Sequence, residues 1–152
     1  MKRTFQTLAE LATHVGQEIA VSDWLTISQE QVNLFADATG DHQWIHVDVE
    51  RAKAGPFGGP IAHGFLTVSL LPKLLESSIE VRESRMGVNY GLNKVRFTAP
   101  VPVGSRLRAR TTLLEAKPID NDGWQMTWNV MIEREGSDKP VCVAESISRR
   151  YP

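Results

Sequence analysis

The residues of this chain best suited to chemistry lie in one short segment, Thr39 to His46. It holds a carboxylate, Asp41, and an imidazole, His46, five positions apart and directly after Gly40. On a helix this spacing would place the two side chains about 140° apart, and on a strand they would face opposite sides of the sheet. We therefore expect an irregular loop that lets them converge as an acid/base pair.

A second segment, Ala62–Phe65, could complete such a site. Gly64 stands between a loop rich in glycine and proline and an apolar run that begins at Phe65, so we expect it to open a helix. A backbone N–H at a helix N-terminus favours negative charge and could stabilise an oxyanion on a carbonyl substrate. Two alternatives stay open: Gly64 could serve close packing, and His63 could either line a pocket or position the helix.

Other candidate sites are weaker. His42 and His46 are four positions apart, a metal-ligand spacing on a helix, but Gln43 stands where a H-E-x-x-H site has Glu. We therefore expect no metal site. Ser69 lies outside any G-x-S-x-G elbow, which disfavours serine hydrolysis. Cys142 is the only cysteine, so no internal disulfide can form, and its alternating surroundings predict a buried thiol.

Length and composition limit the class of protein, its partners and its location. A chain of 152 residues with 41% hydrophobic and 23% charged residues is typical of one globular domain over residues 1–152. A net charge of −1 without a long basic run disfavours nucleic acid as a partner. Neither a secretory signal nor an apolar run of about 20 residues is found, so we expect no membrane association and a cytoplasmic location.

The first half of the chain predicts helices around the candidate site. Three side chains stand where N-caps belong, and one strand is expected between the first two helices. The predicted helices are 8–14 after Thr7, 29–39 after Ser28 and 49–54 after Asp48, and the predicted strand is 21–27. The apolar run from Phe65 to Leu75 predicts a further helix that is buried on all sides. Pro72 should bend or end it, because proline lacks the N–H and clashes with the carbonyl of Val68.

From residue 106 onward the pattern alternates with period two, which predicts strands with one face on a core. The predicted inward faces run through Leu107–Leu113, Trp124–Ile132 and Val141, Val143 and Ile147. Asp120–Gly123 and Gly136–Asp138 are typical of hairpin turns, so neighbouring strands should be antiparallel. The fold class is therefore α+β, an antiparallel sheet around one apolar helix.

Three blocks in order resemble the MaoC-like dehydratases, also called (R)-specific enoyl-CoA hydratases. The blocks are residues 35–48, residues 62–69, and residues 89–97 with 100–104. The motif Gly-Asp-His-Gln-Trp-Ile-His most resembles the branch named after nodulation protein N. The resemblance covers almost the whole chain and implies a single hot-dog domain, a curved antiparallel β-sheet wrapped around one long helix. Two such domains usually pair, so it also implies a homodimer.

The resemblance also implies roles for individual residues. Asp41 and His46 match the catalytic aspartate and histidine. Gly64 matches the glycine whose backbone N–H faces the thioester oxygen, and Ser69 matches a polar residue of the same helix near the site. Gln43 stands where many members have Asn and keeps an amide with a longer reach, and we expect it and His63 beside the substrate.

The implied reaction is reversible addition of water to a trans-2-enoyl-CoA, giving an (R)-3-hydroxyacyl-CoA. It needs no metal or redox cofactor, and coenzyme A enters as part of the substrate. Two other functions stay open: a hot-dog acyl-CoA thioesterase that uses the same oxyanion site, and a non-catalytic acyl-CoA-binding module. The pairing of Asp41 with His46 favours the hydratase, because a pure binder has no need of an acid/base pair.

Overall fold

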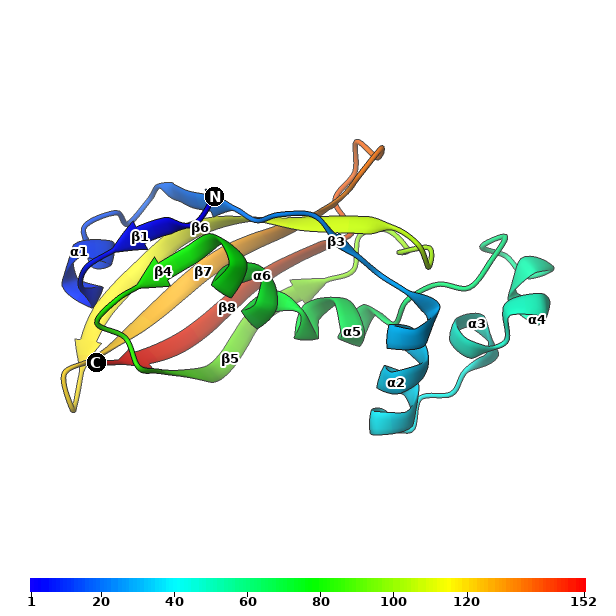
Figure 1. The fold of residues 1–152 in the computed structure, drawn as a ribbon, viewed down its shortest axis with the longest axis horizontal. Coiled ribbons are helices and arrows are strands. Elements are labelled where there is room, and N and C mark those ends of the chain that lie inside the picture. The colour runs from blue at the N-terminus through cyan, green and yellow to red at the C-terminus, as the bar shows by residue number, and fades with distance from the viewer.

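The computed structural model describes residues 1–152, and every helix precedes the long strands (Figure 1). The strands are β1 (Arg3–Phe5), β2 (Glu18–Val21), β3 (Leu25–Thr26), β4 (Ile79–Val81), β5 (Met86–Arg96), β6 (Arg106–Ile119), β7 (Gly123–Arg134) and β8 (Cys142–Tyr151). The helices are α1 (Leu8–Ala12), α2 (Gln29–Thr39), α3 (Trp44–Val47), α4 (Val49–Lys53), α5 (Gly64–Ser69) and α6 (Leu71–Ser78). None of the helices is long and apolar enough to cross a membrane.

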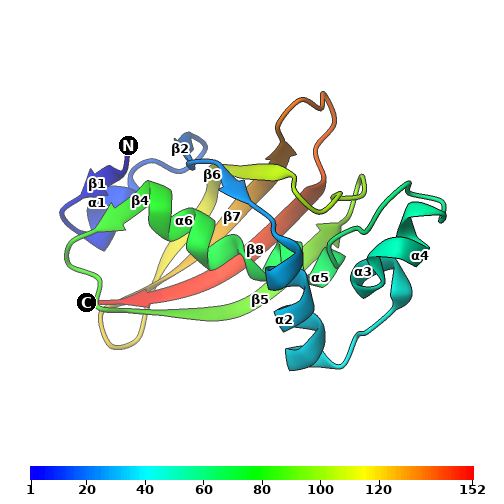
Figure 2. The same cartoon turned by 45° about the vertical axis from the view of Figure 1, so that its right-hand side comes forward.

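One antiparallel sheet dominates the structure. Its strands follow the order β2-β6-β7-β8-β5, and β3 also pairs with β6. The sheet curves around the segment formed by α5 and α6, as two views show (Figures 1 and 2). The predicted α+β fold, a curved antiparallel sheet around a helix, is confirmed. A short parallel pair of β1 and β4, which the sequence analysis does not predict, lies beside it.

The core lies between the concave face of the sheet and the helices. The predicted alternation on β6 and β7 is confirmed. Trp124 at the start of β7 is partly buried, and the other predicted inward side chains are buried: Leu107, Ala109, Thr111 and Leu113 on β6, and Met126, Trp128, Val130 and Ile132 on β7. The turn between these strands has Asn121 at φ 60° and Asp122 at φ 57°, as a tight hairpin requires. The predicted hairpin at Asp120–Gly123 is therefore correct.

On β8 the predicted inward face is wrong. Cys142 pairs with Ile132 and Ala144 with Val130, so these two residues are buried against the core. Val143 lies on the other face and is only partly buried. The thiol of Cys142 is buried as predicted, and this burial raises its pKa to about 11.

The predicted N-caps of three helices are confirmed. The side chains of Thr7, Ser28 and Asp48 each accept a hydrogen bond from the backbone N–H three residues further on. α1 ends at Ala12, two residues earlier than predicted. α2 ends at Thr39 and is followed by Gly40, which has φ 83° and turns the chain toward the candidate site.

The strand predicted over residues 21–27 is wrong. The chain forms β2 and β3 instead, separated by Ser22–Trp24. Ser22 still bonds to β6, since its hydroxyl accepts a hydrogen bond from the N–H of Ala109 at 2.8 Å. Trp24 is not part of the core, and its ring centroid lies 4.4 Å from the guanidinium carbon of Arg108. This cation–π contact takes the tryptophan out of the strand pattern.

The apolar segment after Gly64 forms two helices rather than one, and they meet at Leu70. Pro72 lies in the first turn of α6, where its missing N–H costs nothing, so its predicted effect is confirmed. The prediction that the segment is buried on all sides is wrong. The side chain of Phe65 is 71% exposed, and Ser69 on the same helix is exposed as well. One side of the helical segment therefore stays open in a single chain.

Candidate active site

Asp41 and His46 lie in the turn between α2 and α4. After Gly40, residues 41–43 are irregular, as predicted for this segment. His46 is different, because it lies in the single helical turn of α3 rather than in a loop. The Asp41 carboxylate accepts a long hydrogen bond of 3.4 Å from the N–H of Gln43. These three irregular residues therefore allow the side chains of Asp41 and His46 to converge, although five positions separate them in the sequence.

The ring of His46 is buried and held in one orientation. Its Nδ1 lies 2.6 Å from the carbonyl oxygen of Ile61, and because a carbonyl only accepts, Nδ1 must carry the proton. Gln29 holds the backbone of the same residue, donating from Nε2 to the His46 carbonyl at 2.8 Å. The lone pair on Nε2 of His46 is therefore free to act as a base.

His63 connects this turn to the helix that follows. Its side chain is 2% exposed, and its Nε2 donates to the backbone carbonyl of Asp41 at 2.9 Å. Its ring stacks on that of His46 with a centroid distance of 3.9 Å and an interplanar angle of 24°. Its Nδ1 is buried without a protein partner. The side chain of His63 makes no capping hydrogen bond to α5 and binds the backbone of Asp41 instead, so it ties the turn to the start of the helix.

These three residues form a compact polar cluster. One carboxylate oxygen of Asp41 and one ring nitrogen each of His46 and His63 all lie within 4.8 Å of one another. Asp41 is partly exposed, whereas both imidazoles are buried. A water molecule held between a carboxylate and the free Nε2 of His46 could lose a proton there. The cluster therefore brings together the carboxylate and the imidazole that an acid/base pair needs.

Gly64 begins α5, and no group of the chain accepts a hydrogen bond from its N–H. A Cβ at this position would lie 2.7 Å from Cδ2 of Phe97 and 2.9 Å from its Cγ, so a side chain would collide with the ring. The φ angle of Gly64 is not positive, so space and not conformation requires the glycine. The close-packing interpretation is thus correct, and the free N–H beside the cluster remains available to a ligand.

The other predicted site residues lie outside the cluster. His42 is exposed, and its Nε2 lies 2.9 Å from Oδ1 of Asp37, a hydrogen bond that raises the pKa of His42. His42 and His46 therefore form no pair of metal ligands. Gln43 is exposed at the start of α3, and its side chain makes no capping hydrogen bond. The hydroxyl of Ser69 donates to the carbonyl of Leu66 at 2.7 Å.

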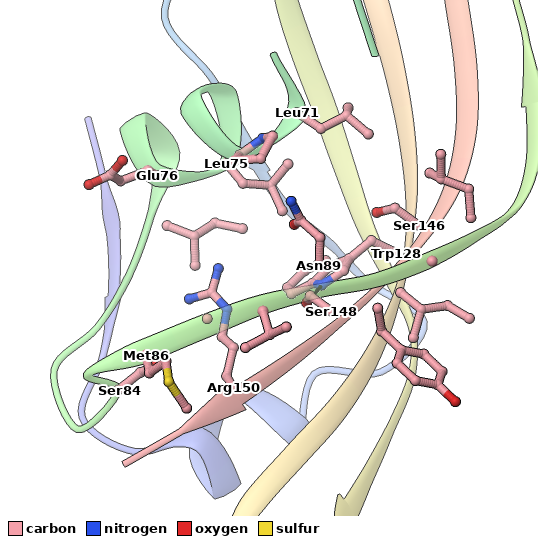
Figure 3. A pocket seen from close by; sticks show the side chains of 18 of the residues that line it. Leu71, Leu75, Glu76, Ser84, Met86, Asn89, Trp128, Ser146, Ser148 and Arg150 are labelled. Atoms are coloured by element: carbon pink, nitrogen blue, oxygen red, sulfur yellow. Dashed lines mark hydrogen bonds between the residues drawn. The ribbon is translucent and has the colours of Figure 1, made fainter. Parts of the chain in front are cut away.

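A large cavity adjoins the helical segment, between α5 and α6 on one side and β5 and β8 on the other (Figure 3). Its volume is about 670 Å³. It does not include Asp41, His46 or Gly64, but Ser69 and Val68 on α5 form part of its wall. This cavity was not predicted from the sequence. On β5 the apolar residues alternate with glycine and asparagine, and the glycine and asparagine face, not the apolar one, turns toward the helices. The cavity has the size of a small-molecule site.

Comparison with known proteins agrees with this geometry. The family model of the MaoC like domain matches residues 10–134. The chain belongs to the MaoC-like dehydratases. It is 58% identical over 147 residues to 3-hydroxyacyl-thioester dehydratase Z of Mycobacterium tuberculosis, covering 97% of both chains. It is 46% identical over 144 residues to nodulation protein N of Rhizobium leguminosarum bv. viciae, covering 93% of this chain and 89% of that one.

A solved structure of the same family shares the fold. The R-hydratase PhaJ1 of Pseudomonas aeruginosa superimposes with a TM-score of 0.71 at 25% identity, covering 94% of this chain and 84% of that one. The hot-dog fold of this MaoC-like dehydratase is therefore confirmed. With these relatives, the chain is an enzyme of the hydro-lyase class.

Asp41, His46 and His63 could also hold a metal ion, since each offers one ligand atom. We expect instead that this MaoC-like dehydratase works without one, because a thioester already acidifies its α position. Exhaustive treatment with EDTA should leave enoyl-CoA hydration unchanged, as measured by loss of the enoyl absorbance. Activity that EDTA abolishes and zinc restores would contradict the expectation and make the cluster a metal site.

Proposed function

We propose that this protein catalyses the reversible addition of water to a trans-2-enoyl-CoA, giving an (R)-3-hydroxyacyl-CoA. The observation that carries the proposal is the cluster of Asp41 and His46 next to the unpaired N–H of Gly64. An acid/base pair beside a free backbone donor suits addition to an activated carbonyl compound. The name of the relative from Mycobacterium tuberculosis, a 3-hydroxyacyl-thioester dehydratase, supports the same reaction.

In the hydration direction, Asp41 and His46 hold one water molecule. Nε2 of His46 accepts a proton from the water as its oxygen forms a bond to the β carbon of the substrate. The electron pair of the double bond moves toward the thioester, whose oxygen becomes negative. The N–H of Gly64 stabilises this charge at the start of α5. The proton then passes from the acid/base pair to the α carbon, which completes the product and restores the site.

The coenzyme A thioester and the acyl chain form the rest of the substrate. The thioester supplies the activation, so the proposal includes no cofactor, and coenzyme A is part of the substrate. The acyl chain runs past Ser69 into the cavity between α6 and the sheet. Leu71 and Leu75 line this cavity and suit methylene groups.

The direct test is the hydration of crotonyl-CoA. We expect the absorbance of the enoyl group to fall in the presence of the protein and chiral analysis to give the (R)-3-hydroxy product. Release of free coenzyme A without hydration would instead support the thioesterase. Tight binding of acyl-CoA with neither reaction would support the binding module and contradict the proposal.

We further propose that two chains assemble through β5. This strand forms one edge of the sheet and exposes several large apolar side chains: Met86 (53%), Val88 (44%), Tyr90 (56%) and Leu92 (48%). A long, apolar edge strand offers unpaired backbone groups and apolar side chains to a strand of another chain. The open side of the helical segment, marked by Phe65, points to the same conclusion.

Light scattering should therefore give a mass near twice the 17.0 kDa of the chain. A Val88→Lys variant, which places a charge on the exposed edge, should shift the population toward the monomer. The matched control is Val15→Lys, since Val15 is also exposed, at 45%, but lies far from β5 in the sequence. A wild-type protein that stays monomeric at micromolar concentration would contradict this assembly.

A further inference from the structure

The inward face of β8 changes character along its length. Alternate residues of one strand share a face, and on β8 this row begins with the buried Cys142 and Ala144 and continues with polar side chains. The polar members are Ser146, Ser148 and Arg150, and all three line the cavity (Figure 3). A sheet face turned toward apolar helices has no structural need for such a row. The change therefore suggests a ligand with a polar end.

Arg150 is the most informative member of the row. Its guanidinium points from β8 toward α6 (Figure 3), and it makes no hydrogen bond or ion pair with the chain. Burial lowers its pKa, while the charge of Glu76 raises it. Glu76 is exposed on α6 and forms no ion pair with this arginine. A partly buried cation without a partner is costly, so an anion that enters the cavity would be bound there.

The space in front of Arg150 is open, and further polar groups surround it. Gly87 on β5 pairs directly with Arg150 and has no side chain to fill that space. Asn89, the next inward residue of β5, pairs with Ser148, and its amide forms no hydrogen bond in the chain. The hydroxyl of Ser148 accepts from Nε1 of Trp128 at 3.1 Å, which orients it. Asn89 can thus assist Arg150 in binding an anion.

The helices α5 and α6 limit the distance between this anion and the reaction. Glu76, whose charge acts on Arg150, lies twelve positions after Gly64 along α5 and α6, so the two helices together span at most roughly 18 Å. An extended chain advances about 1.2 Å per bond, so roughly fifteen bonds span this length. A long acyl chain with its thioester at Gly64 would bring its far end to Arg150.

We propose that the substrate is a long-chain enoyl thioester whose distal end carries a carboxylate, bound by Arg150 at the end of the cavity. The inference rests on the proposed function, because that function places the thioester at Gly64. The phosphates of coenzyme A are a second source of negative charge. The chain end is favoured, because the wall between Ser69 and Arg150 includes Leu71, Leu75 and Ile79, which suit methylene groups better than a polar carrier.

The test measures binding, so that it does not depend on turnover. Isothermal titration calorimetry compares hexadecanoyl-CoA with its ω-carboxy counterpart, both saturated and therefore unreactive. The wild-type protein should bind the ω-carboxy ligand about 10- to 100-fold more tightly, as expected for hydrogen bonds to a charged group. Arg150→Met should abolish this preference, and Arg150→Gln should retain only a small part of it.

Arg149→Met is the matched control. Arg149 is the neighbouring residue on the opposite face of β8, where it donates to Oε1 of Gln125 at 3.0 Å and lies 3.8 Å from the ring of Tyr90. This variant should keep the wild-type preference. Circular dichroism and light scattering of all variants check the fold and the assembly.

Three results would overturn the inference. The wild-type protein could bind both ligands equally. Arg150→Met could weaken both ligands by the same factor, which would assign Arg150 to the carrier phosphates. Arg150→Met could also dissociate the assembly with the preference unchanged, which would assign it to the subunit interface. A preference for the carboxylate in a protein that fails to hydrate crotonyl-CoA would contradict the proposed reaction and support the binding site.

Discussion

Replacing Asp41 by Asn, or His46 by Gln, should each lower kcat for enoyl-CoA hydration by about 10²–10⁴-fold, the usual contribution of a positioned acid or base. Asp41→Asn is isosteric, and His46→Gln keeps a polar side chain of similar size. The asparagine can still accept from the N–H of Gln43, and the glutamine places an amide near the position of Nε2 of His46 but has no basic nitrogen there. The loss should therefore come from proton transfer and not from a displaced turn.

His42→Gln is the matched control for this pair. His42 lies in the same turn but is exposed and bonded to Asp37, so its replacement should leave kcat unchanged. Thermal unfolding should show little change in Tm for all three variants. Near wild-type hydration by both Asp41→Asn and His46→Gln would contradict the mechanism.

The second large effect concerns the N–H of Gly64. A proline at this position removes the N–H but suits the first residue of a helix. The preceding residue, His63, has φ −59° and ψ 138°, an extended conformation that a following proline accepts. A Cβ of either proline or alanine would collide with the ring of Phe97, so a direct comparison with wild type would mix two effects.

The informative comparison is therefore made in a Phe97→Ala background, where the space is available. Gly64→Pro should lower kcat there by about 10²–10³-fold relative to Gly64→Ala, the range for one lost oxyanion donor. Circular dichroism and binding of a substrate analogue should be alike in the two variants. Equal rates for the folded proline and alanine variants would mean that another group holds the thioester oxygen.

The local elements of this protein could be predicted from sequence because their signals are short-range. Thr7, Ser28 and Asp48 each cap a helix through a hydrogen bond that spans three residues, so the pattern alone identifies the start. The turn at Asn121 and Asp122 and the break before Pro72 have the same local origin. For the same reason, the alternation on β6 and β7 assigned the correct face of each strand.

The errors arise where long-range packing decides. On β8 both faces carry small or β-branched residues, so the sequence cannot show that Cys142 and not Val143 meets Ile132. The apolar character of the segment after Gly64 indicates that it is covered, but not by which chain, and Phe65 is exposed here. At the site, Gly40 and the segment after it predicted the irregular stretch that brings Asp41 and His46 together. The stacking of His63 on His46 joins two separate segments, and no local sequence pattern predicts such a contact.

The exposed edge strand β5 has a thermodynamic consequence. It supplies one wall of the cavity, with Gly87 and Asn89 facing the end of the proposed acyl chain. If a second chain covers β5, then assembly and ligand binding are linked equilibria. The factor by which assembly tightens the binding of a long acyl chain must equal the factor by which that chain tightens assembly. Dilution of the protein would then weaken substrate binding, strongly for long acyl chains and only slightly for short ones that do not reach β5.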